Sequence, residues 1–417
     1  MNLLKTSILN GVAVLIKTAT MFILNKILAV YVGPSGYAAI GQFQNFIQMI
    51  TTFAGSAVNN AVVKYTAEYY EDEKKQKTVW KTAGSIVLLF SSIFTLLVLI
   101  FHQTLSLWIF KTEEYGSILI CFAIFLVFFN LNALLLAILN GKKEIVKLIT
   151  ANISGSLFSL VITGLLAVKF GLYGALIALS IYQSINFTVT LYLSYKSEWF
   201  NFSYIWGQID PEFSKKIATF AVMALVSALC VPLSQIVIRS YLVHEYNATY
   251  AGYWEAMIRF SAAYLMLVTT TLSVYYLPRL SELKNLLDIK AEVYLGYKVI
   301  FPLAIVAGVS AYLLKDWIIV LLFSDKFLPM ADLFLWQMIG DTLKIGSWIL
   351  AYLMLSKAML RLFVTTEIIF AISSIVLTYM CTQIFGFSGV SIAHLINYAV
   401  YWLVMSIFVF KNLDMLR

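Results

Sequence analysis

The sequence is poor in charge and in cysteine, and each shortage excludes a class of protein. Only 12% of its 417 residues are charged, whereas soluble domains carry about 25%. Cys121, Cys230 and Cys381 lie far apart in apolar runs, so we expect neither a CxxC metal pair nor a disulfide framework. The sequence also lacks a GxxxxGKS/T phosphate loop, an HExxH pair and a nucleophile elbow. We therefore expect a protein that is not an enzyme and that binds no cofactor.

The sequence is rich in apolar residues. They make up 61% of the chain, and the mean hydropathy is +0.87. A helix needs about 20 apolar residues to cross a bilayer, and twelve runs meet that need. We therefore predict an all-α integral membrane protein with twelve transmembrane helices. The predicted ranges are 7–31, 38–63, 82–101, 116–139, 147–168, 173–195, 217–242, 250–277, 296–314, 331–355, 362–384 and 388–410.

The positions of the cations predict the orientation of the chain. Twenty of the 29 Lys and Arg residues lie at the termini and in the loops after even-numbered spans. The odd-numbered loops contain only Lys111, Lys169, Lys315 and Lys326. Under the positive-inside rule, both termini are expected to be cytoplasmic. The net charge of +8 is thus attributed to membrane topology, and nucleic-acid binding is not expected.

Two short motifs recur about half a chain length apart. Gly36-Tyr37 recurs as Gly252-Tyr253, and the segment from Gly171 to Ala178 recurs as Gly386 to Ala393. Such self-similarity indicates an internal repeat. Six helices per repeat is an even number, so both halves enter the membrane from the same side and are parallel repeats. We predict two lobes, residues 1–205 and 206–417, with a binding region between them.

Eight ionisable residues remain inside the predicted spans. At about 2.5–3.5 kcal/mol for each charge at a helix centre, they cannot all face lipid. The cations exceed the acids by five to three, which favours an anionic cargo. The cations are Lys17, Lys26, Arg239, Arg259 and Lys344, and the acids are Glu255, Asp341 and Glu367.

Simpler explanations remain open for several of these residues. Lys26 and Arg239 lie close enough to the outer ends of their spans to snorkel to the headgroups. Glu255 with Arg259 and Asp341 with Lys344 have helical spacing, so each pair could neutralise itself. Lys17 has no acid at such spacing and lies ten residues into its span, so we expect it to bind an anionic group such as a diphosphate.

Several stretches of the sequence resemble a known family. They are Val32–Tyr37, Val62–Glu68, Tyr275–Ser281 and, most specifically, Asp332–Lys344. Together they resemble the polysaccharide flippases of the multidrug/oligosaccharidyl-lipid/polysaccharide exporter superfamily, within it the O-antigen translocase and lipid III flippase group. The resemblance covers essentially the whole chain. It implies a V-shaped bundle of two six-helix lobes in the bacterial inner membrane.

The resemblance also implies a function. The expected cargo is an undecaprenyl-diphosphate-linked oligosaccharide, moved from the cytoplasmic to the periplasmic leaflet by alternating access. Lys17, Lys26 and the Asp341–Lys344 element match charged positions of that group. The expected partners are the lipid bilayer, a coupling H⁺ or Na⁺ ion, a glycan polymerase and a chain-length regulator, and the protein itself is expected to be a monomer.

Two other functions remain as alternatives. A cation-coupled multidrug antiporter of the same superfamily would use Asp341, Glu255 or Glu367 to exchange H⁺ or Na⁺ for a cationic drug, although surplus positive charge suits that cargo poorly. A membrane glycan polymerase would need a large outer loop or a catalytic cluster, and the sequence offers neither. We interpret His394 as a hydrogen-bonded packing residue rather than a proton relay.

Overall fold

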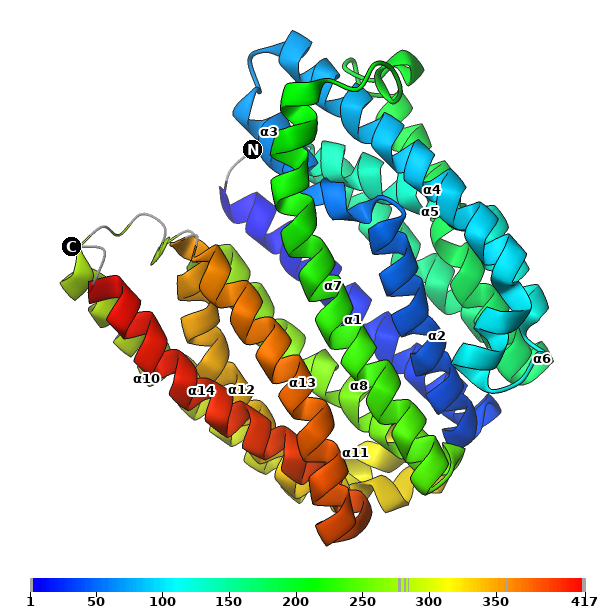
Figure 1. Ribbon diagram of the computed structural model, residues 1–417, viewed down its shortest axis with the longest axis vertical. Coiled ribbons are helices and arrows are strands. Elements are labelled where there is room, and N and C mark those ends of the chain that lie inside the picture. Colours follow the sequence, from blue (N-terminus) through cyan, green and yellow to red (C-terminus); the bar gives the residue numbers. More distant parts are fainter. Residues whose placement is uncertain (1–2, 277–278, 281–282, 284, 358, 415–417) are drawn as a thin grey trace. The chain divides into compact units, whose positions relative to one another are not determined.

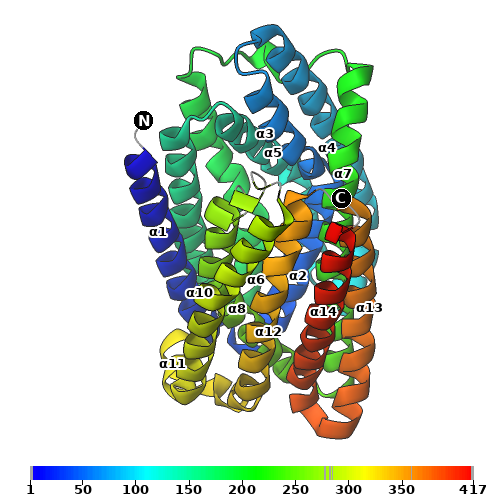
Figure 2. The same cartoon turned by 90° about the vertical axis from the view of Figure 1, so that its left-hand side faces the viewer.

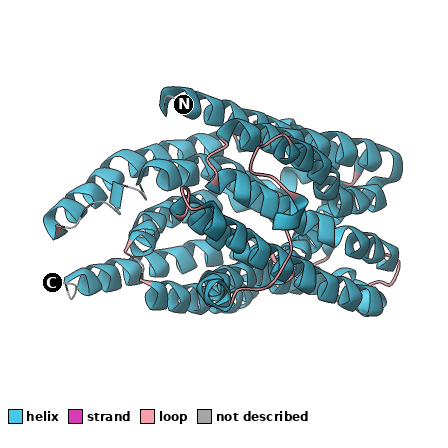
Figure 3. Ribbon diagram, turned by 90° about the horizontal axis from the view of Figure 1, so that it is seen from above, coloured by secondary structure: helices cyan, strands magenta, loops and turns pink. Residues whose placement is uncertain are grey.

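Helices make up almost all of the part of the chain that the structure describes. The computed structural model describes residues 3–276, 279–280, 283, 285–357 and 359–414, and no strand occurs among them (Figure 3). Helices cover most of the predicted apolar ranges within these residues. The range 250–277 and the motif Tyr275–Ser281 extend to residues 277, 278 and 281, which lie outside the described part.

Among the described residues, seven helical segments are long and apolar enough to cross a membrane. They are Gly11–Tyr31, Glu73–Phe110, Gly116–Gly141, Ile145–Tyr195, Leu286–Leu313, Asp325–Ser356 and Arg361–Val409. Ile145–Tyr195 contains the two predicted ranges 147–168 and 173–195, and Arg361–Val409 contains 362–384 and nearly all of 388–410. A lipid-exposed backbone must satisfy its own hydrogen bonds, which explains why apolar runs of this length are helical. The protein is therefore a multi-pass membrane protein.

The chain divides into two compact units. Unit 1 comprises Met1–Gly33 and Ala39–Pro232, and unit 2 comprises Pro34–Ala38 and Leu233–Arg417. Two helices have residues in both units, α2 (Gly33–Phe53) and α7 (Pro211–Glu245). Pro232, inside α7, is the last residue of unit 1.

Unit 1 is built around the contacts of α5 and α6. Besides parts of α2 and α7 it contains α1 (Leu3–Tyr31), α3 (Asn59–Glu68), α4 (Glu73–Phe110), α5 (Gly116–Gly141) and α6 (Ile145–Tyr195). α5 packs against α3, α4 and α6, while α1 packs against α6 (Figure 1). The core of the unit includes the fully buried Trp80, Val87 and Leu134.

A break interrupts the second predicted range. α2 ends before Gly55, whose φ of 139° is outside the helical region. The carbonyl of Ala54 then needs donors from elsewhere. Ser91 Oγ at 2.7 Å and Asn130 Nδ2 at 3.2 Å supply them, so buried polar side chains stabilise the broken helix.

Local sequence fixes the starts of several helices. Asp72 caps α4 by accepting a hydrogen bond from the Lys75 N–H, and this bond lowers the pKa of the Asp72 carboxyl. Asn247 and Asn285 accept equivalent bonds at the starts of α8 (Ala248–Thr271) and α10 (Leu286–Leu313). Asp and Asn favour this position because their oxygens satisfy N–H groups of the first turn.

Unit 2 is built around α12 (Ala331–Ser356). Its other elements are α8, the π-helical turn η3 (Leu272–Tyr276), α10, α11 (Lys315–Leu322), η4 (Asp325–Met330), α13 (Leu360–Phe385), η5 (Gly386–Ser388) and α14 (Gly389–Asp414). α12 packs against α10 and α14, and α13 lies beside α14 (Figure 2). The core includes Ile349, Met354 and Met405, all fully buried.

The same glycine turn occurs in each unit. Gly171 in α6 has φ 57° and ψ −134°, and Gly386 after α13 has φ 62° and ψ −150°. A Cβ on Gly174 would lie 2.0 Å from the Leu166 carbonyl oxygen, and one on Gly389 would lie 2.3 Å from that of Cys381. Residues eight apart in a straight helix are separated by about 12 Å. Both glycine pairs therefore allow the chain to turn back on the preceding helix.

Candidate functional site

A buried carboxylate lies in the middle of α12. The predicted site residue Asp341 is 0% exposed, so its charge needs hydrogen-bond donors at close range. Ser261 Oγ and Tyr264 OH, both on α8, donate to its Oδ2 at 2.6 Å each. Gln337 Nε2, one turn earlier on α12, donates to Oδ1 at 3.3 Å. Both carboxylate oxygens are thus satisfied without water.

The remaining partner of Asp341 comes from α14. His394 Nε2 lies 2.9 Å from Asp341 Oδ1. A Cβ on Gly340 would lie 2.5 Å from His394 Cδ2 and 3.1 Å from the Leu395 Cα. The absence of a side chain at Gly340 therefore allows α14 to approach α12 closely enough for this pair to form. The prediction that His394 is hydrogen-bonded is confirmed.

Lys344 is partly buried beside this cluster. Its Nζ lies 5.2 Å from the centre of the Trp348 ring and 5.0 Å from that of Tyr398. Such contacts attract a cation through the ring face. The hydrogen bonds of the Asp341 carboxylate go to His394, Ser261 and Tyr264. Lys344 is close enough to Asp341 for an electrostatic interaction, so the expected neutralisation of this pair occurs through space rather than through a hydrogen bond.

A second charged cluster joins α7 to α8 within unit 2. Glu255 is 4% exposed and Arg239 is 1% exposed, and Arg239 Nη2 forms a salt bridge with Glu255 Oε2. Arg259 Nε donates to the other oxygen of Glu255 at 2.8 Å. Arg239 thus does not snorkel, and the expected pairing of Glu255 with Arg259 is present. Two arginines share one carboxylate, which leaves a net charge of +1.

Aromatic rings cover both arginines of this cluster. The Arg239 guanidinium lies 5.4 Å from the Trp254 ring centre, and that of Arg259 lies 5.2 Å from the Tyr37 ring centre. Tyr37 belongs to the short part of α2 that is assigned to unit 2. The side chain of Arg259 is 14% exposed, against 2% for Arg239, so Arg259 is the more accessible arginine.

The other predicted site residues lie outside these two clusters. Glu367 on α13 is partly buried and is close enough to Lys344 for an electrostatic interaction. Lys17 on α1 is exposed, and Lys26 on the same helix is partly buried. Both lysines belong to unit 1, whereas the six other predicted residues belong to unit 2.

Four residues that hold Asp341 are not among the predicted site residues. They are Ser261, Tyr264, Gln337 and His394. The sequence carried two signals for them: the helical spacing of Gln337 and Asp341, four residues apart on α12, and the position of His394 inside an apolar span, which indicated a hydrogen bond but not its partner. Ser261, Tyr264 and His394 come from α8 and α14, so their contact depends on tertiary packing.

Curated relatives match almost the whole chain. The chain is 30% identical over 403 residues to the lipid III flippase of Escherichia coli strain K12, covering 96% of this chain and 97% of the relative. The lipid III flippase of Shigella flexneri matches to the same extent. These are full-length similarities rather than matches to a single motif.

Solved transporters share the fold. An inward-facing multidrug-resistance MATE family transporter of the MOP superfamily matches with a TM-score of 0.76 and 14% identity, over 95% of this chain and 96% of its own. The lipid II flippase MurJ in an inward closed conformation matches with a TM-score of 0.73 and 16% identity, over 99% and 90%. The all-helical, MOP-like fold that the sequence predicts is confirmed.

A comparison of the sequence with known protein families, rather than with solved structures, gives the family assignment. Residues 3–284, more than half of the chain, match the family described as polysaccharide biosynthesis protein. The suspected relationship to polysaccharide flippases is confirmed by this match together with the curated relatives. The chain belongs to the polysaccharide biosynthesis protein family.

Proposed function

We propose that this protein is a flippase that moves an undecaprenyl-diphosphate-linked oligosaccharide from the cytoplasmic to the periplasmic leaflet by alternating access. The observation that carries the proposal is the 30% identity to the lipid III flippase of Escherichia coli over 97% of that relative. The family match and the MurJ-like fold support it. The cargo is thus an O-antigen repeat unit or a related surface glycan such as lipid III.

The proposed topology has twelve transmembrane helices in the bacterial inner membrane, with both termini in the cytoplasm. The lobes are residues 1–205 and 206–417, and the protein acts as a monomer beside a glycan polymerase and a chain-length regulator. The recurring glycine turn at Gly171 and Gly386 supports two equivalent repeats. Labelling of single cysteines placed in each loop tests the orientation.

The proposed ligands of the diphosphate are Lys17, Lys344 and Arg259. Lys17 is exposed, Lys344 and Arg259 are partly buried, and two charges 4 Å apart attract by about 4 kcal/mol at an effective dielectric of 20. Arg239 and Glu255 orient Arg259, and Lys26 serves another stage of the cycle. This role fits the surplus of cations over acids within the spans.

The proposed coupling ion is H⁺, bound at Asp341. The four hydrogen-bond partners of Asp341 described above are hydroxyl, amide and imidazole groups that can donate, whereas a metal cation needs several oxygen ligands aimed at one point. No group of three His, Cys, Asp or Glu side chains that could hold a metal occurs among the described residues. Glu367 modulates the site through Lys344.

The decisive experiment follows the lipid-linked oligosaccharide in a strain that lacks the gene. We expect it to accumulate in the cytoplasmic leaflet, and the wild-type protein to restore export. Lys17→Ala and Lys344→Ala should each abolish export, while the matching Arg variants should retain part of it. Unchanged export with both Ala variants would refute the diphosphate role. Accumulation in the periplasmic leaflet would instead favour a defect in glycan polymerisation.

The antiporter alternative makes a different prediction. If Asp341 exchanged H⁺ for a cationic drug, overexpression would raise drug resistance and deletion would leave surface polysaccharide normal. Transport into liposomes with a pH or Na⁺ gradient separates the two ions. We expect a dependence on the pH gradient that Asp341→Asn abolishes.

A further inference from the structure

An apolar groove runs along the surface of unit 1 and has no place in the proposed transport steps. It consists of two adjoining cavities, of about 610 Å³ and 400 Å³, that share Phe187, Leu191 and Phe202. Its walls come from α4, α5, α6 and the short helix η2 (Phe202–Tyr204). Volumes of 300–1,000 Å³ are typical of ligand sites.

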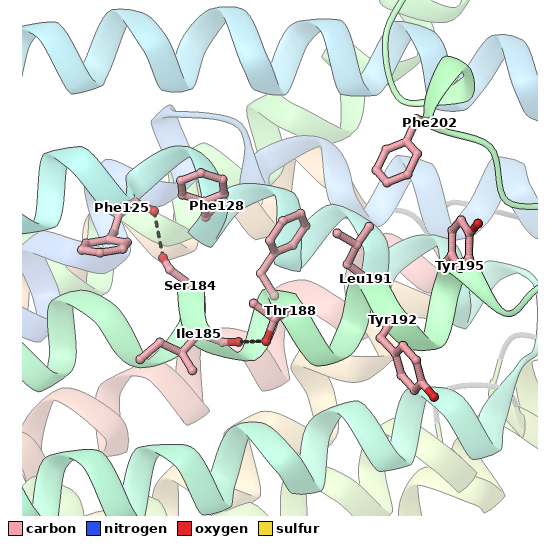
Figure 4. A pocket seen from close by; sticks show the side chains of 10 residues that line it. Phe125, Phe128, Ser184, Ile185, Thr188, Leu191, Tyr192, Tyr195 and Phe202 are labelled. Atoms are coloured by element: carbon pink, nitrogen blue, oxygen red, sulfur yellow. Dashed lines mark hydrogen bonds between the residues drawn. The ribbon is translucent and has the colours of Figure 1, made fainter.

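The lining of the larger cavity suits an apolar ligand better than a polar one. Its side chains are aromatic or aliphatic except for Ser184 and Thr188, and Tyr192 and Tyr195 add hydroxyls at one end (Figure 4). Ser184 Oγ donates to the Phe125 carbonyl oxygen at 2.9 Å, and Thr188 Oγ1 donates to that of Ile185 at 2.7 Å. Both hydroxyl protons are therefore engaged within the protein. The groove suits a hydrocarbon chain.

The length of the groove matches one leaflet of a bilayer. Along α6 it extends from Ser184 to Tyr195, and eleven residues of helix rise by about 16 Å. Half of a hydrocarbon core of about 30 Å is about 15 Å. A phospholipid acyl chain fits this length, whereas an undecaprenyl chain is several times longer than the groove.

Cations lie at the end of the groove that is formed by Tyr192 and the short helix η2. Lys196 Nζ lies 4.4 Å from the ring centre of Tyr192, which lines the groove. Lys81 Nζ lies 5.9 Å from the ring centre of Tyr204, in the same short helix as the lining residue Phe202. Lys77 also reaches Tyr204 but is paired with Glu73 at 2.8 Å. One acid, the exposed Glu198, lies two residues after Lys196 in the sequence.

We propose that this groove binds an anionic phospholipid of the cytoplasmic leaflet. One acyl chain lies between α5 and α6, and Lys196 and Lys81 bind the phosphate of the headgroup. The end of α6 with these lysines is the end that the distribution of loop cations places in the cytoplasm, where the leaflet is negatively charged. The lipid site shares no residue with the proposed ligands of the cargo. Its test therefore does not depend on the flippase function.

Native mass spectrometry of the purified protein tests the proposal with two probes, dioleoylphosphatidylglycerol and dioleoylphosphatidylcholine. We expect the anionic lipid to bind about 25-fold more tightly, because two lysines near its headgroup each contribute about 1 kcal/mol. Lys196→Gln and Lys81→Gln should each weaken that preference about fivefold, since a lysine near an anionic headgroup contributes about 1 kcal/mol. Lys169→Gln, outside the groove, is the matched control and should change nothing.

A second variant tests the hydrocarbon part of the site. Leu191→Trp places a larger side chain where the two cavities meet and should reduce binding of both lipids at least fivefold. Leu165→Trp, at an exposed position of α6 outside the lining, should not. Thermal unfolding checks that both variants fold. Equal affinity of the wild type for the two lipids, or unchanged binding by folded Leu191→Trp, would overturn the proposal. So would displacement of phosphatidylglycerol by undecaprenyl phosphate at lower concentration.

Discussion

The two units bury different kinds of polar side chain. Among the described residues, the buried charged side chains are Arg239, Glu255 and Asp341, and all three belong to unit 2. The buried polar side chains of unit 1 are amides and hydroxyls such as Asn130 and Ser91. The buried polar side chains of unit 1 are therefore neutral, and some of them, such as Asn130 and Ser91, bind backbone carbonyls. The interior of unit 2 also contains charged side chains.

This difference between the units changes how we interpret the surplus of five cations over three acids inside the predicted spans. In unit 2 the arginines share Glu255, and Asp341 is surrounded by donors, so the charges there are largely balanced within the unit. In unit 1, Lys17 lies inside a predicted span and is exposed on α1. We therefore expect an anionic cargo to interact with Lys17 more than with the charges of unit 2.

The largest effect on stability is expected from Glu255→Ala. The substitution leaves two arginines without their shared carboxylate, and breaking a buried ion pair costs about 3–5 kcal/mol. The free energy of unfolding in detergent micelles measures the loss. The control is the double variant Arg239→Met/Glu255→Met, in which most of the stability should return because neither charge of that salt bridge is left. A loss below about 1 kcal/mol for Glu255→Ala would show that this cluster is hydrated.

A smaller and matched effect is expected from Gly174→Ala in unit 1 and Gly389→Ala in unit 2. In each case the new Cβ would meet a backbone carbonyl oxygen, at 2.0 Å and 2.3 Å respectively, and overpacking costs about 1–3 kcal/mol. Gly11→Ala is the control, since a Cβ there has nothing within 4 Å. A cost in only one unit would show that the two turns are not equivalent.

Most of the fold could be predicted because membrane helices follow from length and hydropathy alone. The predicted range 116–139 matches α5, and 331–355 matches α12 to within a residue or two. The break in the range 38–63 could not be predicted, since it depends on Ser91 and Asn130 from α4 and α5. Partners that are distant in sequence decide where an apolar run is interrupted.

The sequence identified charged residues that the structure brings together in unit 2, but it did not identify their partners on other helices. Asp341, Glu255 and Arg259 were identified by the cost of a charge in a bilayer, and the spacing of Arg259 from Glu255 indicated that the two could pair. The pairing of Arg239 with Glu255 and of His394 with Asp341 joins different helices. Sequence spacing indicates neighbours on one helix only, so these contacts required the packing of α7 on α8 and of α14 on α12.

Asn130→Ala tests whether the polar interior of unit 1 has a purely structural role. The Asn130 side chain donates to the Ala54 carbonyl and the Ser91 hydroxyl and accepts from Ser56. Its loss leaves buried groups unsatisfied, which costs about 1–3 kcal/mol. Thermal unfolding measures this cost, with the exposed Asn152→Ala as control. Export by the folded fraction should be retained, and a folded but inactive variant would contradict the assignment.

The smallest change in stability, with the largest change in transport, is expected from Lys17→Ala. Lys17 is exposed on α1, and substitutions at such positions usually shift stability by no more than about 0.5 kcal/mol. Thermal unfolding of the purified variant and oligosaccharide export in the deletion strain are measured together. Lys17→Arg is the matched control, since Arg keeps the positive charge that attracts a phosphate. Loss of stability in parallel with loss of export would mean that Lys17, like the charges of unit 2, is part of the packed interior, and the contrast between the two units would not extend to α1.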